Sequence, residues 1–418
     1  MRRRRTAIGG LTVVLVALAV ALVAGLTARS SQAAAQKGKT ITVWDFFIGS
    51  PKERAAFNAV AQQWARKTGN KVVNAGDVDG SKDKFKLSAR TGRGPDIIQL
   101  PHDNLGDVAA PGLLAPQPTG FQVSRGLYDQ VGLTATTYKG KLYGLPIGRE
   151  SYFLFYNKAL VQTPPKTWTA LIATAKRLTT GDRYGFLWDT GNFYYAYNWI
   201  RGYGGYVFKV TKNGYDASKL GINTPGGIRG LKFIQDLVTI HKLTPASTNT
   251  DIAEGSFKSG KAAMIIDGPW AVGGFRTAGI NFGMAPLPKL PNGKASAPFV
   301  GVQALFVNKY SKNTKEAWDL VRYLSTHLPM PLFRASGRVP VLKSAANSKA
   351  VKNSAVAKAV VQASNNGEPM PNIPAMGTVW GPMGDQLQLL VQGKTTPAAA
   401  ARAAQERIAR AIQEQGGG

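Results

Sequence analysis

The fold of this chain is set by residues 41–73, which read ITVWDFFIGSPKERAAFNAVAQQWARKTGNKVV. Residues 41–44 are typical of a strand, and Ser50-Pro51-Lys52-Glu53 combines an N-cap serine, a proline at the first helical position and a capping-box glutamate. Gly69 ends the helix that this pattern predicts, and a second strand begins at Lys71. The segment therefore predicts a β-α-β unit. The helix has apolar residues at helical spacing, namely Phe57, Val60, Ala61 and Trp64.

The same alternation continues along the chain. A short helix around Phe85 and Leu87 precedes a strand in Gly94-Pro95-Asp96-Ile97-Ile98, which favours an α/β domain with a largely parallel sheet. About 380 residues follow the first 37, more than one core usually supports, so we expect two domains. Further helices are expected after N-cap threonines, at Thr167-Trp168, Thr224-Pro225 and Thr396-Pro397.

Residues 1–35 have the pattern of an export signal. Arg2 to Arg5 form a positively charged start, an apolar run extends from Ala7 to Ala28, and small residues up to Ala35 offer a cleavage site. Because the apolar run is longer than the usual ~7–15 residues, an uncleaved N-terminal membrane anchor is the alternative. In both cases we expect the rest of the chain outside the cytoplasm, in the periplasm or at the cell surface.

The chain contains no cysteine, which excludes disulfides, thiolate metal sites and a lipid-modified cysteine anchor. It has 52 basic and 23 acidic residues and a net charge of +29; without Arg2 to Arg5 and Arg29, 47 basic residues remain and the charge is +24. Such a charge suits anionic surfaces or nucleic acid, but the basic residues are spread along the chain. A solvated basic surface is the simpler interpretation, and we expect no nucleic-acid partner.

Two segments are candidates for an aromatic binding surface. Residues 193–199, FYYAYNW, contain more rings than one buried helical stripe holds, which suggests an aromatic-lined cleft. Residues 367–380, GEPMPNIPAMGTVW, place three prolines ahead of Trp380. We expect this segment to form a stiff loop rather than a helix or an inner strand, and to hold Trp380 as a platform. A plug over the core is the alternative.

Signals for catalysis and metal binding are weak. His102, His241 and His327 are far apart in sequence, and there is no G-x-S-x-G motif, so we expect neither a metal nor a cofactor. Asp103 and Glu150 stand beside turn segments, where carboxylates can accept hydrogen bonds from sugar hydroxyls while rings stack on the apolar sugar face. They can equally be a glycosidase acid and nucleophile or surface charges, and the residues alone do not decide.

A series of short motifs occurs in the order seen in maltose-binding proteins. With the opening segment, they are Gly94-Pro95-Asp96-Ile97-Ile98 with His102-Asp103, Gly112-Leu113-Leu114, Pro146-Ile147 before Glu150, Tyr156-Asn157-Lys158, Pro164-Pro165-Lys166-Thr167-Trp168, Gly268-Pro269-Trp270-Ala271 and Pro298-Phe299-Val300-Gly301-Val302. The chain resembles maltose- and maltodextrin-binding proteins, the extracytoplasmic solute-binding proteins of ATP-binding-cassette (ABC) sugar importers. The resemblance covers nearly all of the chain after the N-terminal segment.

The resemblance implies an α/β fold of two lobes with a hinge and a central ligand cleft, the type II periplasmic-binding-protein fold. One lobe would contain residues 37–148 and 299–347, and the other would contain residues 149–298 and 348–418. The chain would cross between the lobes near residues 146–148, 298–300 and 344–351. Sugar bound across the cleft would shift an equilibrium between open and closed forms, and the closed form would dock on the permease.

The resemblance also implies which residues bind the ligand. Asp103 and Glu150 match positions that accept hydrogen bonds from sugar hydroxyls, and Asp83 matches such a position in a gapped region. The rings that match stacking positions are Tyr194, Trp270 and Trp380.

Several positions depart from the family pattern. Where the family commonly has a tryptophan, an arginine and a glutamate, this chain has Leu100, Asn104 and Asn192. Phe46 or Phe47 is expected to supply the ring that is absent at Leu100. Maltose itself is therefore less firmly implied than the class of oligosaccharides.

We therefore expect a monomeric receptor without enzymatic activity that captures maltose or maltodextrin-type oligosaccharides and delivers them to the membrane permease subunits of an ABC importer. A cyclodextrin, trehalose or another glucoside is the alternative ligand. A different class, an exported glycoside hydrolase, would use Glu150 with Asp103. A polyanion- or cell-wall-binding protein would instead use the basic surface, and its binding would weaken steeply with salt.

Overall fold

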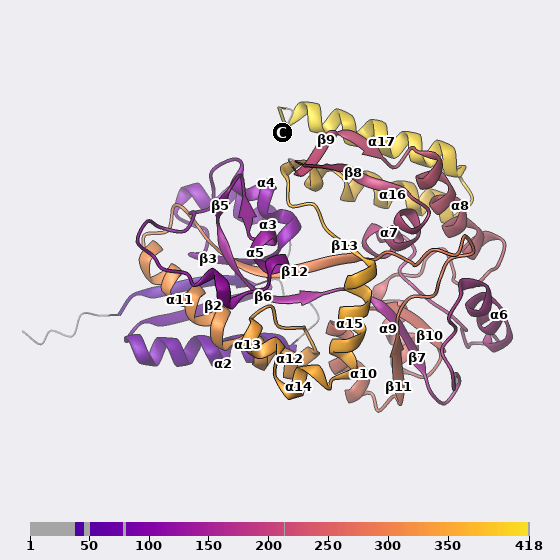
Figure 1. Ribbon diagram of the computed structural model, residues 1–418, viewed down its shortest axis with the longest axis horizontal. Coiled ribbons are helices and arrows are strands. Elements are labelled where there is room, and N and C mark those ends of the chain that lie inside the picture. The colour runs from indigo at the N-terminus through magenta and orange to yellow at the C-terminus, as the bar shows by residue number, and fades with distance from the viewer. Residues whose placement is uncertain (1–37, 46–50, 78–80, 213, 417–418) are drawn as a thin grey trace, which may run out of the picture.

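The computed structural model describes residues 38–45, 51–77, 81–212 and 214–416. The expected export signal, together with Phe46 and Phe47, lies outside these residues. Within the described ranges, every helix is too short or too polar to cross a lipid bilayer. Figure 1 shows two bodies of helices and strands side by side, with β6 and β12 lying between them.

A six-stranded sheet is the centre of the first body. Its order is β13-β12-β3-β1-β2, and β6 pairs with the free side of β12. The strands are β1 (Thr40–Asp45), β2 (Lys71–Asp77), β3 (Ile97–Pro101), β6 (Gly144–Glu150), β12 (Phe299–Val307) and β13 (Glu368–Pro369). β1 runs parallel to β2 and β3, as the β-α-β pattern predicts, whereas β12 runs antiparallel to β3 and β6. The expectation of a largely parallel sheet is therefore correct only for its N-terminal part, because β12 enters from a distant part of the chain.

Helix α2 (Pro51–Thr68) covers this sheet together with α11 (Thr314–His327) and α12 (Pro329–Ser336). The four apolar residues expected on the buried face of α2 are all in the core. Trp64 also donates its indole N–H to Asp319 of α11 at 2.8 Å. The shorter elements of this body are α3 (Ser81–Ser88), α4 (Leu105–Ala109), α5 (Gln130–Ala135), β4 (Thr137–Tyr138), β5 (Lys141–Leu142) and α13 (Lys343–Ala346).

The second body is built around a small antiparallel sheet. Its central strand, β7 (Phe153–Asn157), pairs with β10 (Met264–Asp267) and β11 (Phe282–Ala285). A hairpin of β8 (Tyr206–Thr211) and β9 (Gly214–Gly221) lies near α17. The helices are α6 (Trp168–Leu178), α7 (Phe193–Gly202), α8 (Pro225–Thr239), α9 (Thr250–Lys258), α10 (Val272–Thr277), α14 (Lys349–Lys352), α15 (Ala355–Asn366), α16 (Trp380–Val391) and α17 (Pro397–Glu414).

The three helices expected after threonine caps begin where the sequence predicts. The side chains of Thr167, Thr224 and Thr396 accept hydrogen bonds from backbone N–H groups at the third residue of each helix. Each cap satisfies a donor that the first helical turn leaves without a partner.

Residues 367–380 differ from the expected loop. Glu368 and Pro369 form the short edge strand β13, residues 374–378 form a 3-10 turn, and α16 begins at Trp380. Pro374 stands at the first position of its turn, where the missing N–H has no helical partner to lose. The segment is therefore more regular than its prolines suggest, although it still leads directly to Trp380.

Strand β12 contributes to the cores of both bodies. Leu305 and Val307 pack in the cluster around Trp64, whereas Phe299 packs in the cluster around Trp168 and Trp199. The Phe299 ring lies parallel to the Tyr197 ring, with the centroids 3.7 Å apart. The strand thus connects the two bodies and lies between them (Figure 1).

Candidate ligand-binding cleft

A cavity of about 450 Å³ lies where the ends of several strands and helices meet. The first body contributes residues from α2, from the end of β3, from β12 and from the loop after α12, whereas the second contributes the start of α7, the turn after β10 and the start of α16. The residues that line the cavity are Glu53, Pro101, Asp103, Asn104, Glu150, Asn192, Tyr194, Tyr195, Trp270, Gln303, Arg338, Met370 and Trp380.

Five of the candidate residues identified from the sequence meet in this one cavity. They are Asp103, Glu150, Tyr194, Trp270 and Trp380. Their spacing along the chain gives no reason for them to meet, and only the packing of the two bodies brings them together.

The remaining candidates do not join this group. Asp83 is exposed on α3 and is not among the residues that line the cavity, so the geometry does not support the assignment made in the gapped region. Phe46 and Phe47 lie outside the described residues. Leu100, which replaces a family tryptophan, lies in β3 with its side chain buried in the core, and it is not among the residues that line the cavity.

Each of the two tryptophans lies beside a buried carboxyl group. The side chain of Trp380 is close enough to Asp103 to oppose the rise in pKa that burial causes in that carboxyl group, and the side chain of Trp270 has the same effect on Asp267. The indole N–H, a tryptophan's only donor, is the group that can interact with a carboxyl group in this way. Both rings are half-buried, so part of each ring surface remains accessible from the cavity. Such surfaces suit the apolar face of a sugar ring.

Gly268 explains the position of the Trp270 ring. A Cβ atom at residue 268 would lie 2.2 Å from the nearest ring atom of Trp270, closer than carbon atoms can approach without a clash. The Gly268-Pro269-Trp270 motif therefore has a physical basis, because the glycine leaves the space that the ring occupies.

Asp103 and His102 are both buried, and burial shifts the pKa of each in the direction that favours its neutral form. Burial raises the pKa of Asp103 to about 6, and hydrogen bonds to its carboxylate oppose this shift. Burial lowers the pKa of His102 to about 4. The Val302 N–H donates to Nδ1 of His102 at 3.1 Å, so Nε2 carries the proton and donates to the Met370 carbonyl at 3.0 Å. A neutral histidine thus connects β12 to the segment before Trp380.

Glu150, the last residue of β6, belongs to an ionic network in the cleft. Its carboxylate pairs with the Arg338 guanidinium and accepts a hydrogen bond from Gln303 at 2.8 Å. Arg338 also holds both oxygens of Glu53, at 2.8 and 3.0 Å. Among the described residues, no group of three or more acidic, histidine or cysteine side chains is arranged to hold a metal ion.

Arg338 and Gln303 line the cavity but were not predicted from the sequence, and Glu53 was predicted only as part of a helix cap. The cap partner Ser50 lies outside the described residues, and Glu53 contacts Ser336 and Arg338 instead of serving only a local turn. Gly337 is a typical helix terminator that redirects the chain, but it does not single out the arginine that follows it.

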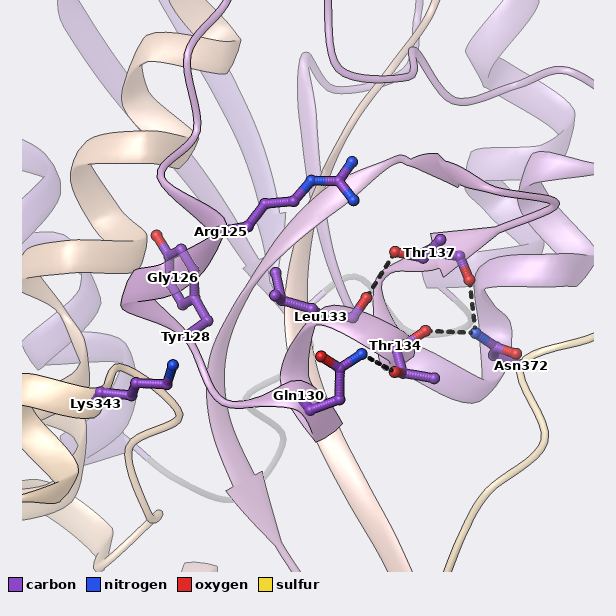
Figure 2. A pocket seen from close by; sticks show the side chains of 9 residues that line it. All are labelled: Arg125, Gly126, Tyr128, Gln130, Leu133, Thr134, Thr137, Lys343 and Asn372. Atoms are coloured by element: carbon purple, nitrogen blue, oxygen red, sulfur yellow. Dashed lines mark hydrogen bonds between the residues drawn. The ribbon is translucent and has the colours of Figure 1, made fainter.

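A second hollow, of about 560 Å³, lies beside α5 (Figure 2). Its lining contains one aromatic ring, that of Tyr128, and neither tryptophan nor carboxylate side chains. Figure 2 shows Asn372 donating to the Thr134 and Thr137 carbonyls, at 3.2 and 3.0 Å. This hollow is larger than the cleft, but it lacks the combination of stacking rings and hydrogen-bond acceptors that the cleft offers.

Comparisons with known proteins agree with this architecture. The family model described as bacterial extracellular solute-binding protein matches residues 49–327. A galactooligosaccharide-binding protein from Bacillus subtilis (strain 168) is 35% identical over 376 residues, which is 88% of this chain and 88% of the relative. A maltooligosaccharide ABC transporter solute-binding lipoprotein from Streptococcus pneumoniae is 32% identical over 372 residues, which is 86% of this chain and 86% of the relative.

The solved structures point to the same fold. The Thermus thermophilus maltotriose-binding protein bound with maltotriose superposes with a TM-score of 0.83 at 36% identity. The match covers 89% of this chain and 100% of the Thermus protein. The two-lobe fold, the matched family model and these relatives agree over most of the sequence, and the chain belongs to the bacterial extracellular solute-binding protein family.

Proposed function

We propose that this protein captures a maltodextrin-type oligosaccharide outside the cytoplasmic membrane and delivers it to the permease subunits of an ABC importer. The observation that carries the proposal is the pair of half-buried tryptophans in one cleft, Trp270 and Trp380, each beside a buried carboxyl group. Sugar rings would stack on these faces, and Asp103 and Glu150 would accept hydrogen bonds from hydroxyl groups. The relatives named for maltooligosaccharides and maltotriose support this ligand class.

Hinge closure would couple capture to delivery. The proposed lobes are residues 37–148 with 299–347, and residues 149–298 with 348–418. The position of β12 in both cores supports a crossing near Phe299, because a strand shared by two bodies can act as a hinge element. A sugar that contacts both lobes would stabilise the closed form by its extra affinity for that form.

A calorimetric titration of the protein with maltose, maltotriose, longer maltodextrins, a cyclodextrin and trehalose tests the ligand class. Trp270→Ala and Trp380→Ala should each weaken binding by about 5- to 150-fold, the equivalent of roughly 1–3 kcal/mol of buried ring surface. Tyr310→Ala is a matched control, because this half-exposed ring lies outside the cleft. Unchanged affinity in both tryptophan variants would place the site elsewhere.

A galactooligosaccharide is the second candidate ligand. It is favoured by the relative of that name, which is 35% identical over most of both chains, and by the changed cleft positions Asn104 and Asn192. Including galactooligosaccharides in the titration separates the two classes, because the preferred ligand will show the lower dissociation constant.

We further propose that the protein acts as a monomer without catalytic activity and without a nucleic-acid partner. Its relatives are named as binding proteins. Release of reducing ends from maltodextrin, lost in Glu150→Gln, would instead establish a hydrolase. Binding that weakens steeply with salt would favour a polyanion ligand, since a neutral sugar releases no counterions.

The proposed location is extracytoplasmic, with residues 1–35 acting as a cleaved export signal or as a membrane tether. The family description as extracellular supports export. The Streptococcus relative is a lipoprotein, whereas this chain has no cysteine to carry a lipid. Mass spectrometry of the exported protein distinguishes cleavage near Ala35 from an intact N-terminus.

A further inference from the structure

Arg338 and Glu150 face each other across an antiparallel backbone pairing. The Arg149 N–H donates to the Val339 carbonyl at 2.7 Å, and the Val339 N–H donates to the Arg149 carbonyl at 3.1 Å. In an antiparallel pairing, the next residues on the two segments also stand opposite each other, with their side chains on one face. Those residues are Glu150 and Arg338, so the backbone itself places the two opposite charges side by side.

Two glycines make this placement possible. Gly337 ends α12 in the left-handed conformation, with φ 85° and ψ 8°, and turns the chain back toward β6. At Gly148 on β6, a Cβ atom would lie 2.8 Å from Cγ and Cδ of Arg338. The arginine stem therefore occupies space that any other residue at 148 would fill.

The guanidinium group divides its donors between two carboxylates. Nε and Nη2 bind the oxygens of Glu53 at 2.8 and 3.0 Å, and Nη1 pairs with Oε2 of Glu150. The other Glu150 oxygen accepts from Gln303 at 2.8 Å, and Gln303 is itself held by Gln99. The side chains of Arg338 and Glu150 are only 6% and 7% exposed. Both oxygens of Glu150 thus have a protein partner; Oε1 retains a second acceptor position, whereas Oε2 is buried against Arg338.

We propose that Arg338 is the positioning residue that keeps Glu150 ionised and fixes its orientation as an acceptor for ligand hydroxyl groups. This inference rests on the proposed function, because it concerns the same cleft. A planar guanidinium favours the carboxylate over the carboxylic acid and holds it in one plane, which a lysine or a water molecule does not do. Arg338 acts on the sugar through Glu150 and need not touch it.

The test compares Arg338→Lys with the double variant Glu53→Gln/Arg338→Met. Lysine keeps a positive charge but loses the fork that reaches both carboxylates. The double variant removes the arginine together with the charge of its other carboxylate partner, Glu53. Arg322→Met is the matched control, because it removes an arginine whose ion pair with Asp319 lies outside the cleft.

The readouts are the maltotriose dissociation constant and the melting temperature without ligand, both measured from pH 5 to pH 8. At pH 7 the double variant should bind roughly 10- to 100-fold more weakly, as for the loss of one well-oriented charged hydrogen bond, and the lysine variant should fall between it and wild type. The control should match wild type.

Addition of Glu150→Gln to the double variant isolates the titration of Glu150. Asp103, Tyr194 and Tyr195 also line the cavity, but they are common to both variants, so a difference between the two pH profiles reports Glu150. We expect a titration in the double variant that is absent from the triple variant. Identical profiles, or wild-type affinity in the double variant, would overturn the role of Arg338. Failure of wild type to bind maltotriose would count against the proposed ligand, while the ligand-free melting profiles would still test Arg338.

Discussion

Gly268→Ala is expected to weaken sugar binding while leaving the fold nearly as stable. The backbone at Gly268 is extended, with φ −110° and ψ −178°, a conformation that alanine adopts without strain. The new Cβ, however, would lie 2.2, 2.3 and 2.5 Å from three atoms of the Trp270 ring. Since carbon atoms in contact stand about 3.5–4.0 Å apart, the ring must move by roughly 1–1.5 Å.

The ring will move rather than the backbone, because it is the half-buried end of a side chain. Its movement removes the stacking surface from the cleft and disturbs the interaction with Asp267. Loss of one stacking ring is worth about 1–3 kcal/mol, or 5- to 150-fold in affinity. Gly268→Ala should therefore approach the affinity of Trp270→Ala, and the double variant should be no weaker than Trp270→Ala alone, since both changes remove the same contact.

Calorimetric titration with maltotriose and a thermal melt of each variant make the comparison. Gly381→Ala is the control, because no atom lies within 4 Å of the Cβ it would add beside Trp380. It should keep wild-type affinity and gain about 0.5–1 kcal/mol of helix stability. Wild-type affinity in Gly268→Ala, or losses that add in the double variant, would refute the reasoning that Gly268 holds the ring in place.

Three further predictions concern residues around the cleft. Burial raises the pKa of Asp103 from 3.8 to about 6, so the folded protein keeps a proton that the unfolded chain releases. The free energy of unfolding should therefore decrease between about pH 4 and 6, by at most about 3 kcal/mol. Thermal melts of Asp103→Asn should not show this decrease. Burial lowers the pKa of His102 from 6.5 to about 4. Its contribution to the free energy of unfolding therefore rises as the pH increases from about 4 to 6.5. A pH profile of stability that is the same in His102→Gln as in wild type would contradict this prediction. Asn372 donates to three carbonyls at 3.0–3.4 Å; Asn372→Ala should cost about 1–2 kcal/mol in urea unfolding, and an unchanged midpoint would show that these bonds contribute nothing.

The regular elements could be predicted where the signal lies within one or two turns of the chain. Thr224 and Pro225 start a helix because the threonine satisfies a backbone donor three residues away and the proline needs no partner there. The same local reasoning failed for residues 367–380. It treated the prolines as barriers to helix, although Pro374 occupies a position where the helix tolerates it.

The candidate site was predictable only in part. Trp270 and Asp103 were found through motifs that they share with a family, Trp380 was also indicated by the prolines before it, and the structure places all three in one cleft. Arg338 was not found, because a single arginine after a glycine has no distinctive pattern. Its partner Glu53 is separated from it by 285 residues, and no local rule connects them.

The sequence by itself determined the β-α-β opening, the capped helices, the lack of thiol chemistry and the resemblance to a family, because these depend on residues close together or on the order of motifs. Only the tertiary structure decided which carboxylates meet which rings, which charges neutralise each other and how β12 joins the two bodies. The physical reason is that these contacts depend on the relative positions of elements packed against one another, and a shift of an ångström changes a hydrogen bond or a stacking contact without changing any local pattern.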